Sequence, residues 1–499
     1  MKLALLSVTD KTGIVEFAKG LEKNGYQVIS TGGTYKILIK NGVNVLTVEY
    51  LTGSKEILNG RVKTLNPIIH GGILYKRDNM NHQQTIDEMG ISAIDLVCVN
   101  LYQFENAVKK NLEEDLIIEE IDIGGPTMIR AAAKNFNDVL IVTDKEDYNI
   151  VLDKLESGSI TNDFRKYLAG KAFNIIARYD QAISNYFNPT NNTINLEYIK
   201  DLSYGENPHQ QASLFKKSND ASLMDMEQLN GKAMSYNNYN DVFAAMEILH
   251  DFKDEEYFAV AIKHGTICCA AAGNAILDAY LKSYKNDPIS IFGGIVAFNS
   301  KVDLATATEL NKIFLEIIVA PDYDHDALEV LRTKKNVRVM RYKDLNYSYS
   351  YSYKDLDGYY LKQSRDLDLI NNIEVATKTK PNNEMLEDML FGMKVVKNIK
   401  SNGIAIVKNK EVLAICGGQT ARVFAIQDAL LNYKDKDYNG AILASDAFFP
   451  FQDSVEMAHK AGIKGIVQPG GSKNDQDSIN YCDQNDLPMV LTGIRHFKH

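Results

Sequence analysis

Short apolar runs alternate with amphipathic stretches through the first third of the chain. The apolar runs at 3–7, 27–30, 43–48, 96–100 and 139–143 are predicted strands, and the stretches at 12–23 and 34–40 are predicted helices. Regular alternation of strand and helix is typical of a mostly parallel sheet with helices on its faces. The pattern therefore predicts an α/β domain.

A polar segment interrupts this pattern. Helical patterns at 147–155 and 163–186 come first, and the sequence N-P-T-N-N-T at 188–193 follows them. Clusters of Asn, Pro and Thr between periodic segments are typical of loops. This segment is the best linker candidate, and it predicts domains at 1–190 and 197–499.

The strand and helix pattern restarts after the linker. A strand is predicted at 257–263, and a helix of small residues is predicted from Ala270. Residues 294–321 and 440–469 both give strand, helix, strand and proline, which predicts two similar α/β units at about 197–360 and 361–499. The alternative is that any two strand–helix–strand segments look alike.

Tyrosine and serine alternate strictly at 347–353. Such alternation places the tyrosines on one face of a strand or hairpin. A platform for stacking bases would need basic residues between the tyrosines, and this segment has none. A surface hairpin is the favoured interpretation.

Composition limits the classes of partner. The chain has 499 residues, which is long enough for about three domains. Its net charge of −10 argues against bulk affinity for nucleic acid or an anionic membrane. No apolar run approaches a membrane span, and the first residues lack the form of a signal peptide. Five cysteines without a C-x-x-C motif favour a reducing, cytoplasmic location.

Two turns in the first domain could bind a phosphate. The segment S-V-T-D-K-T-G at 7–13 follows one predicted strand, and S-T-G-G-T at 30–34 follows the next. Hydroxyl groups, glycine N–H groups and a helix N-terminus together favour an anion. Each turn alone is more often an ordinary strand–helix connection, but the pair favours phosphate binding.

Charged side chains lie close to these turns in the sequence. Arg61 and Lys63 would share one face of an extended segment. Asp122 ends an apolar run before two glycines and Pro126, which suits the first position of a helix. Lys134 on that helix could exchange protons with Asp122 if a cleft shifts their pKa values. The alternative is that all these charges are structural.

The second half of the chain contains a separate candidate for a catalytic site. Lys263 and His264 close an apolar strand, where open α/β sheets often place catalytic groups. Histidine can transfer a proton near neutral pH, and the neighbouring lysine could stabilise an oxyanion. A merely structural histidine is an equal alternative. The spacing of His and Cys disfavours a zinc site.

Taken together, these segments resemble those of one family. It comprises the bifunctional purine biosynthesis proteins, which are both a transformylase for aminoimidazole carboxamide ribonucleotide (AICAR) and an inosinate (IMP) cyclohydrolase. The matching segments are 7–13, 30–34, 60–65, 121–135, 204–210, 231–238, 263–264, 445–453, 468–472 and 492–499. The resemblance implies a Rossmann-type domain like methylglyoxal synthase at 1–190, and a transformylase of two cytidine-deaminase-like units without zinc at 197–499.

The resemblance also implies the reactions, which are the last two steps of IMP synthesis. A formyl group passes from 10-formyltetrahydrofolate to AICAR, and the product FAICAR then closes its ring with loss of water. No catalytic metal, nucleic acid or membrane partner is expected. Family members are homodimers with the transformylase site at the subunit interface.

Site residues are implied residue by residue. Ring closure would use Lys63, Tyr102, Asp122 and Lys134, and the nucleotide would be held by Ser7, Lys11, Thr31, Gly32, Gly33, Thr34, Arg61, Thr64, Asn100 and Gly124. Formyl transfer would use Lys263, His264 and Asn402, with the nucleotide at Tyr204, Asn238, Gly293, Glu316 and Arg495 and the folate at Arg422, Phe448, Asp453 and Ser472.

The chain departs from the family pattern at Ser203, where many relatives have an arginine. This departure removes a phosphate ligand. Two other functions remain open from the sequence: a zinc-dependent nucleoside deaminase fused to a regulatory domain, and a nucleotide-binding sensor without catalysis. The first needs bound zinc, and the second needs degenerate catalytic positions.

Overall fold

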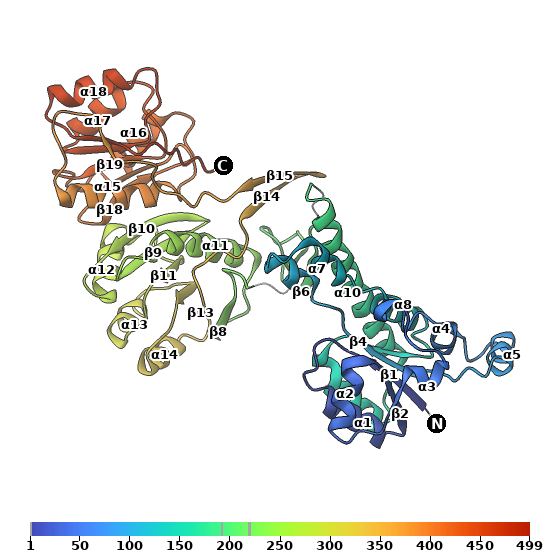
Figure 1. The fold of residues 1–499 in the computed structure, drawn as a ribbon. Coiled ribbons are helices and arrows are strands. Elements are labelled where there is room, and N and C mark those ends of the chain that lie inside the picture. The colour runs from blue at the N-terminus through green and yellow to red at the C-terminus, as the bar shows by residue number, and fades with distance from the viewer. Residues whose placement is uncertain (1, 191–192, 218–220) are drawn as a thin grey trace. The chain divides into compact units, whose positions relative to one another are not determined.

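The computed structural model describes residues 2–190, 193–217 and 221–499. The chain forms two compact units, Met1–Asn195 and Leu196–His499 (Figure 1). Asn191 and Asn192 of the expected linker lie outside the described residues. No helix among the described residues is long and apolar enough to cross a membrane.

The first unit is built on one parallel sheet, as the alternation predicts. Its strands in spatial order are β3 (Val45–Thr47), β2 (Tyr26–Ser30), β1 (Lys2–Ser7), β4 (Leu96–Val99) and β5 (Leu140–Val142). Its helices are α1 (Ile14–Lys23), α2 (Gly32–Lys40), α3 (Val48–Thr52), α4 (Pro67–Leu74), α5 (Met80–Glu88), α6 (Phe104–Lys109), α7 (Glu114–Glu119), α8 (Gly124–Lys134), α9 (Tyr148–Glu156) and α10 (Asn162–Phe187), with short 3₁₀ turns η1 (Leu58–Gly60) and η2 (Lys145–Asp147). All five predicted strands are confirmed.

The central strand β1 forms the core of this unit. Leu5 and Leu6 are completely buried between the helices on the two faces, and burying each side chain is worth about 1.5–3 kcal/mol. The helix α8 packs against β4 and α10, while α1 packs against β2 and α9. Because all five strands are parallel, their carboxyl ends and the loops that follow them meet at one edge.

The second unit is built on a sheet of twelve strands. In spatial order they are β16 (Glu374–Val375), β21 (Met489–Leu491), β20 (Gly465–Gln468), β19 (Ile442–Ser445), β17 (Ile404–Lys408), β18 (Glu411–Cys416), β10 (Thr266–Ala272), β9 (Phe258–Lys263), β11 (Ile295–Phe298), β12 (Ile317–Ala320), β13 (Arg338–Tyr342) and β8 (Met226–Asn230). Its helices are α11 (Tyr236–Asp251), α12 (Ile276–Asn286), α13 (Leu304–Leu310), α14 (His325–Arg332), α15 (Asn383–Val396), α16 (Arg422–Asn432), α17 (Asp453–Lys460) and α18 (Asp475–Gln484). A separate pair of strands is β6 (Leu196–Leu202) and β7 (Ala212–Lys217).

The two halves of this sheet have the same order of strands. Outward from β10 the order is β9, β11, β12 and β13, and outward from β18 it is β17, β19, β20 and β21. In both halves an antiparallel pair is followed by three parallel strands. The two halves meet where β10 pairs with β18.

The helix predicted from Ala270 is wrong, because this residue lies in strand β10. Ala270 is completely buried and pairs with Val260 of β9, and the next residue Ala271 pairs with Glu411 of β18. The helix preference of alanine is worth less than about 1 kcal/mol per residue. Backbone hydrogen bonds to a strand on each side outweigh it here, and the helix α12 begins only at Ile276.

The hairpin predicted around the Tyr/Ser segment is confirmed for its second part. Strands β14 (Tyr351–Leu356) and β15 (Tyr359–Ser364) pair antiparallel. Asp357 and Gly358 both have positive φ, as a two-residue turn between strands requires. Tyr347 precedes the hairpin, and its hydroxyl lies 3.2 Å from Oε1 of Glu247.

Candidate active site

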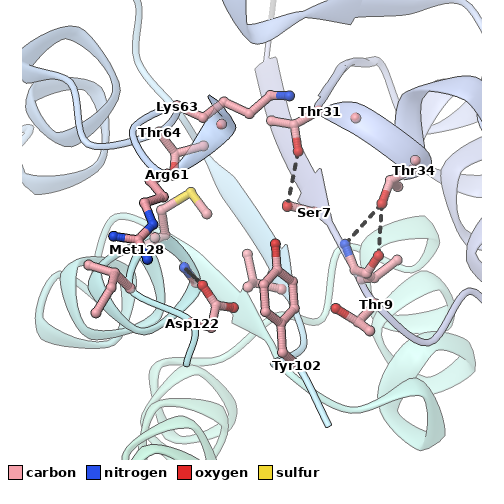
Figure 2. Close-up of a pocket in the computed structure, with 18 of the residues that line it drawn as sticks. Ser7, Thr9, Thr31, Thr34, Arg61, Lys63, Thr64, Tyr102, Asp122 and Met128 are labelled. Carbon is pink, nitrogen blue, oxygen red and sulfur yellow. Dashed lines mark hydrogen bonds between the residues drawn. The ribbon is translucent and has the colours of Figure 1, made fainter. Parts of the chain in front are cut away.

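A cavity of about 760 Å³ opens beyond the carboxyl ends of β1, β2 and β4 (Figure 2). Its volume is in the range typical of small-molecule sites. Of the residues expected at the first site, those that line it are Ser7, Lys11, Thr31, Gly32, Gly33, Thr34, Arg61, Lys63, Thr64, Asn100, Tyr102, Asp122 and Gly124. The structure therefore brings these residues together in one place.

The two predicted phosphate turns are joined by hydrogen bonds at one end of this cavity. Oγ of Ser7 lies 3.2 Å from Oγ1 of Thr31. The Thr34 hydroxyl donates to the carbonyl of Val8 at 2.9 Å and lies 3.1 Å from its N–H group. A Cβ atom at Gly33 would lie 3.4 Å from Cε of Lys11, so the two turns approach closely. The N-terminus of α2 and the Lys11 ammonium group thus face the same region, which suits an anion.

Arg61 and Lys63 line the cavity from a turn, not from the extended segment expected for them. The turn η1 precedes them, and Asn59 within it has a φ of 55°. Arg61 forms an ion pair with Glu119, and Nζ of Lys63 lies 2.6 Å from Oε2 of Glu56. Both carboxylates line the cavity too. The two cations expected to meet the substrate are therefore already paired within the protein.

Asp122 and Tyr102 point into the cavity from the side opposite Lys63 and Thr31 (Figure 2). Burial raises the pKa of Asp122, while the N–H groups of Gly125 and Gly124 partly offset this effect. Burial also raises the pKa of Tyr102, and the charge of Asp122 raises it further. These shifts make Asp122 a better proton acceptor than an ordinary aspartate and keep Tyr102 protonated.

The two glycines after Asp122 are explained by close contacts. A Cβ atom at Gly125 would lie 2.3 Å from Oδ2 of Asp122, and one at Gly124 would lie 2.7 Å from Oγ1 of Thr64. Oδ1 of Asp122 accepts a hydrogen bond from the Gly125 N–H at 2.9 Å. The helix α8 begins at Gly124, two residues before the position predicted from Pro126.

Lys134 does not line this cavity. It is the last residue of α8, and its side chain is exposed. Arg130 on the same helix is also exposed and lies over the ring of Phe173. The structure thus places Asp122 in the cavity and Lys134 outside it.

In the second unit, Lys263 and His264 occupy the turn between β9 and β10. Both line a smaller cavity of about 290 Å³, together with Cys268, Ile399 and Gly417. Nζ of Lys263 donates to the carbonyl of Phe292 at 2.9 Å. The cavity therefore lies where the two halves of the large sheet meet.

Other expected residues lie at the same edge of the first half but have protein partners. The register of β9, β11, β12 and β13 places Gly293 and Glu316 near Lys263 along this edge. Oε2 of Glu316 pairs with Nη1 of Arg338 at 2.8 Å. The Asn238 side chain accepts from the Ser235 N–H and thereby caps α11.

The second half contributes Asn402 and Arg422 to this edge. Arg422 is buried, where it donates to Ser445 at 2.8 Å and forms an ion pair with the completely buried Asp446. Its other nitrogen, Nη2, donates to Oδ1 of Asn402 at 2.8 Å. The Arg422 side chain is thus engaged within the protein through both of its terminal nitrogens.

The remaining expected residues are partly or fully exposed. Tyr204 is 37% exposed and Phe448 is 36% exposed. Arg495 lies over the ring of Phe497, 4.2 Å from its centre. Asp453 accepts from the Ser454 N–H, and the hydroxyl of Ser472 accepts from the Asn474 N–H.

The sequence analysis missed several polar residues that contact the expected ones. Glu56 and Glu119 pair with the cations of the first cavity, Asp241 contacts the turn at His264, and Asp446 holds Arg422. Asp446 lies in the matching segment 445–453, but no role was expected for it. Opposite charges in neighbouring loops could have indicated the ion pair of Glu56. No local pattern in the sequence indicates a role for Asp241.

Comparisons with known proteins identify the family of the chain. The model of the AICARFT/IMPCHase bienzyme family matches residues 132–432, and the model of the MGS-like domain matches residues 13–127. The bifunctional purine biosynthesis proteins PurH of Clostridioides difficile (strain 630) and Clostridium botulinum (strain Kyoto / Type A2) are 53% and 51% identical to the chain. Each alignment covers 100% of both chains. A solved structure described as "Crystal structure of ForH" is 39% identical over 37% of this chain and 98% of its own, with a TM-score of 0.34. The chain therefore belongs to the AICARFT/IMPCHase family of bifunctional purine biosynthesis enzymes, and its N-terminal domain is MGS-like.

Proposed function

We propose that the chain catalyses two consecutive reactions that end in IMP. In the first, the amine of AICAR attacks the formyl carbon of 10-formyltetrahydrofolate. The bond from that carbon to the folate nitrogen breaks, and FAICAR and tetrahydrofolate leave. In the second, the carboxamide nitrogen of FAICAR attacks its own formyl group, and water is lost as the ring closes.

The observation that carries the proposal is the first cavity. It combines an anion-binding end with a half-buried aspartate and a tyrosine, within a volume of about 760 Å³. A nucleoside monophosphate with a carboxamide group needs both features. The phosphate suits Ser7, Thr31 and the N-terminus of α2, and the heterocycle would then extend toward Asp122 and Tyr102.

Ring closure is an intramolecular step, so positioning supplies much of its rate. Asp122 is placed to accept the proton of the carboxamide nitrogen as that nitrogen attacks. Tyr102 can donate a hydrogen bond to the formyl oxygen, and Lys63 can stabilise the developing negative charge. Lys134 lies outside the cavity, so its role rests on the family resemblance alone.

Formyl transfer is proposed at the edge of the large sheet. His264 would take the proton lost by the attacking amine, and Lys263 would stabilise the tetrahedral oxyanion. Arg422 would act indirectly there, by orienting the amide of Asn402. Because the expected nucleotide and folate residues are spread over an exposed surface, we propose that a second copy of the chain completes the site in a cytoplasmic homodimer.

A coupled assay tests this function. Purified chain supplied with AICAR and 10-formyltetrahydrofolate should form FAICAR and then IMP. The variants Lys263→Ala and His264→Ala should lose formyl transfer and keep cyclisation of supplied FAICAR. Failure of the unaltered chain to form either product would overturn the proposal, and loss of both reactions in these variants would contradict separate sites.

A further inference from the structure

The turn that carries His264 has an unusual backbone. Lys263 and Thr266 pair across it, and its two central residues, His264 and Gly265, have φ angles of 54° and 68°. A turn whose two central residues both have the left-handed backbone conformation best matches the twist of a β-hairpin. Glycine adopts this conformation freely, but a histidine does so uncommonly. Contacts from outside the turn are therefore needed to hold His264 in place.

Asp241 of the helix α11 supplies such a contact. Its Oδ1 accepts a hydrogen bond from the Gly265 N–H at 2.6 Å. Burial raises the pKa of Asp241, while the Gly265 N–H, the charge of His264 and the His264 N–H oppose this effect. The carboxylate therefore contacts the turn backbone at Gly265 and lies close enough to the His264 imidazole to interact with its charge.

The helix α11 is itself fixed on the side that faces the turn. Asn238 and Ser235 form a reciprocal capping box at its first turn. Asp241 follows Asn238 by three residues, so the two side chains lie on neighbouring positions of one helix face. Lys263 is held separately, by its hydrogen bond to Phe292. The position of His264 thus depends on α11 through Asp241, and that of Lys263 does not.

We propose that Asp241 is a positioning residue for formyl transfer, holding the His264–Gly265 turn so that the imidazole meets the attacking amine. This inference rests on the proposed role of His264. The proton that the amine loses passes to the imidazole as the new carbon–nitrogen bond forms. The folate nitrogen gains a proton as its bond to the formyl carbon breaks, so protons balance over the reaction.

Two substitutions separate the hydrogen bond from the charge. Asp241→Asn keeps an oxygen that can accept from Gly265, whereas Asp241→Ala removes both acceptor and charge. We expect Asp241→Ala to lower the kcat of formyl transfer roughly 100-fold with little change in the KM for AICAR, because misplacement of a catalytic group acts on the chemical step. Asp241→Asn should lose about tenfold, and Asp241→Glu should lie closer to the unaltered chain than Asp241→Ala.

The intact chain provides the controls. Cyclisation of supplied FAICAR by the same variants reports on the other site and should not change. Asp254→Asn alters an exposed aspartate beyond the end of α11 and should leave both reactions unchanged. If Asp241→Ala does not fold, the kcat of formyl transfer in Asp241→Asn and Asp241→Glu provides the test.

The outcomes distinguish this inference from the function on which it rests. If the unaltered chain transfers formyl groups and His264→Ala does not, but all Asp241 variants keep kcat within about twofold, Asp241 has no positioning role. A rise in KM alone would also overturn the inference, because it would indicate lost binding. If His264→Ala itself remains active, the proposed role of His264 fails first.

Discussion

Lys63 shows how a residue expected to bind substrate can be occupied before substrate arrives. Its ammonium group pairs with Glu56 at 2.6 Å, and Lys63 lowers the pKa of that exposed carboxyl group. A substrate phosphate or carbonyl must compete with this pair. An ion pair exposed to solvent is weak, so the competition is modest.

Glu56→Gln should therefore lower the KM for FAICAR by up to about fivefold at low salt, because Lys63 loses the closer of its two carboxylate partners and keeps Glu49 at 4.0 Å. The difference should shrink as salt increases. Cyclisation rates over a series of FAICAR concentrations measure it, with Glu156→Gln on an exposed position of α9 as the control. A higher KM in Glu56→Gln would instead mean that Glu56 holds Lys63 in its working position.

The raised pKa of Asp122 leads to a prediction about the rate of cyclisation at acid pH. Burial raises its pKa, so at a given acid pH more of it is protonated than of an ordinary aspartate, whose pKa is about 3.9. The role proposed for Asp122 in ring closure needs its carboxylate form as the proton acceptor. The kcat/KM for cyclisation should therefore fall, as pH is lowered, with a midpoint above that ordinary value.

The fall of kcat/KM at acid pH is measured by following cyclisation of supplied FAICAR across the pH range in which the protein stays folded. Asp122→Asn should be nearly inactive throughout. A profile that remains flat down to the pH of unfolding would exclude Asp122 as the proton acceptor.

At the scale of single residues, the gathering of these residues around one cavity was predictable, because most of them lie at or after the ends of predicted strands. Ser7 ends strand β1, Thr31 and Asn100 lie directly after β2 and β4, and the carboxyl ends of such parallel strands meet. Lys134 shows the limit of this reasoning. Its position on α8 was predictable, but which helix face meets the cavity depends on how α8 packs against β4 and α10.

At the scale of elements, strands with β-branched residues were predictable and strand β10 was not. The cysteines and alanines of β10 carry little local preference for a strand, and their state is set by β9 and β18 on either side. The buried ion pair of Arg422 and Asp446 could not be predicted from the sequence for the same reason. Arg422 belongs to helix α16 and Asp446 follows strand β19. The two residues lie in different elements and meet only in the folded sheet.

The start of α8 gives a prediction at this scale. Gly125→Ala would place a Cβ atom 2.3 Å from the Asp122 carboxylate and force it to move. The kcat of cyclisation should fall at least tenfold, as expected for a displaced catalytic group. Gly170→Ala is the matched control, because a Cβ atom at this exposed position inside α10 meets nothing within 4 Å. That control should stabilise the protein by about 0.5–1 kcal/mol in chemical unfolding, since alanine favours a helix. Equal cyclisation rates in the two variants would contradict this account of Asp122.

At the scale of the whole molecule, the division into two units was predictable from the polar segment at 188–193, and the repeat was visible in the paired strand–helix–strand segments. The joining of the two repeats into one sheet was not visible. It depends on the contact between β10 and β18, where Ala271 pairs with Glu411 across 140 positions of the sequence. Neither strand carries a local signal for its partner.

This organisation makes cyclisation separable from the second unit. Every residue that lines the first cavity lies between Ser7 and Met128, and the core beneath it is formed by residues of the first unit. A fragment of residues 1–195 should therefore fold and cyclise supplied FAICAR, with a kcat/KM within about threefold of the intact chain, because a folded unit keeps its own core and site. The fragment of residues 196–499 should not cyclise FAICAR. Thermal unfolding of each fragment controls for misfolding, and the fragment 1–195 carrying Asp122→Asn controls for contaminating enzyme. If a well-folded first fragment is inactive and recovers on addition of the second, the cyclohydrolase site extends beyond the first unit and the assignment of this cavity as complete is wrong.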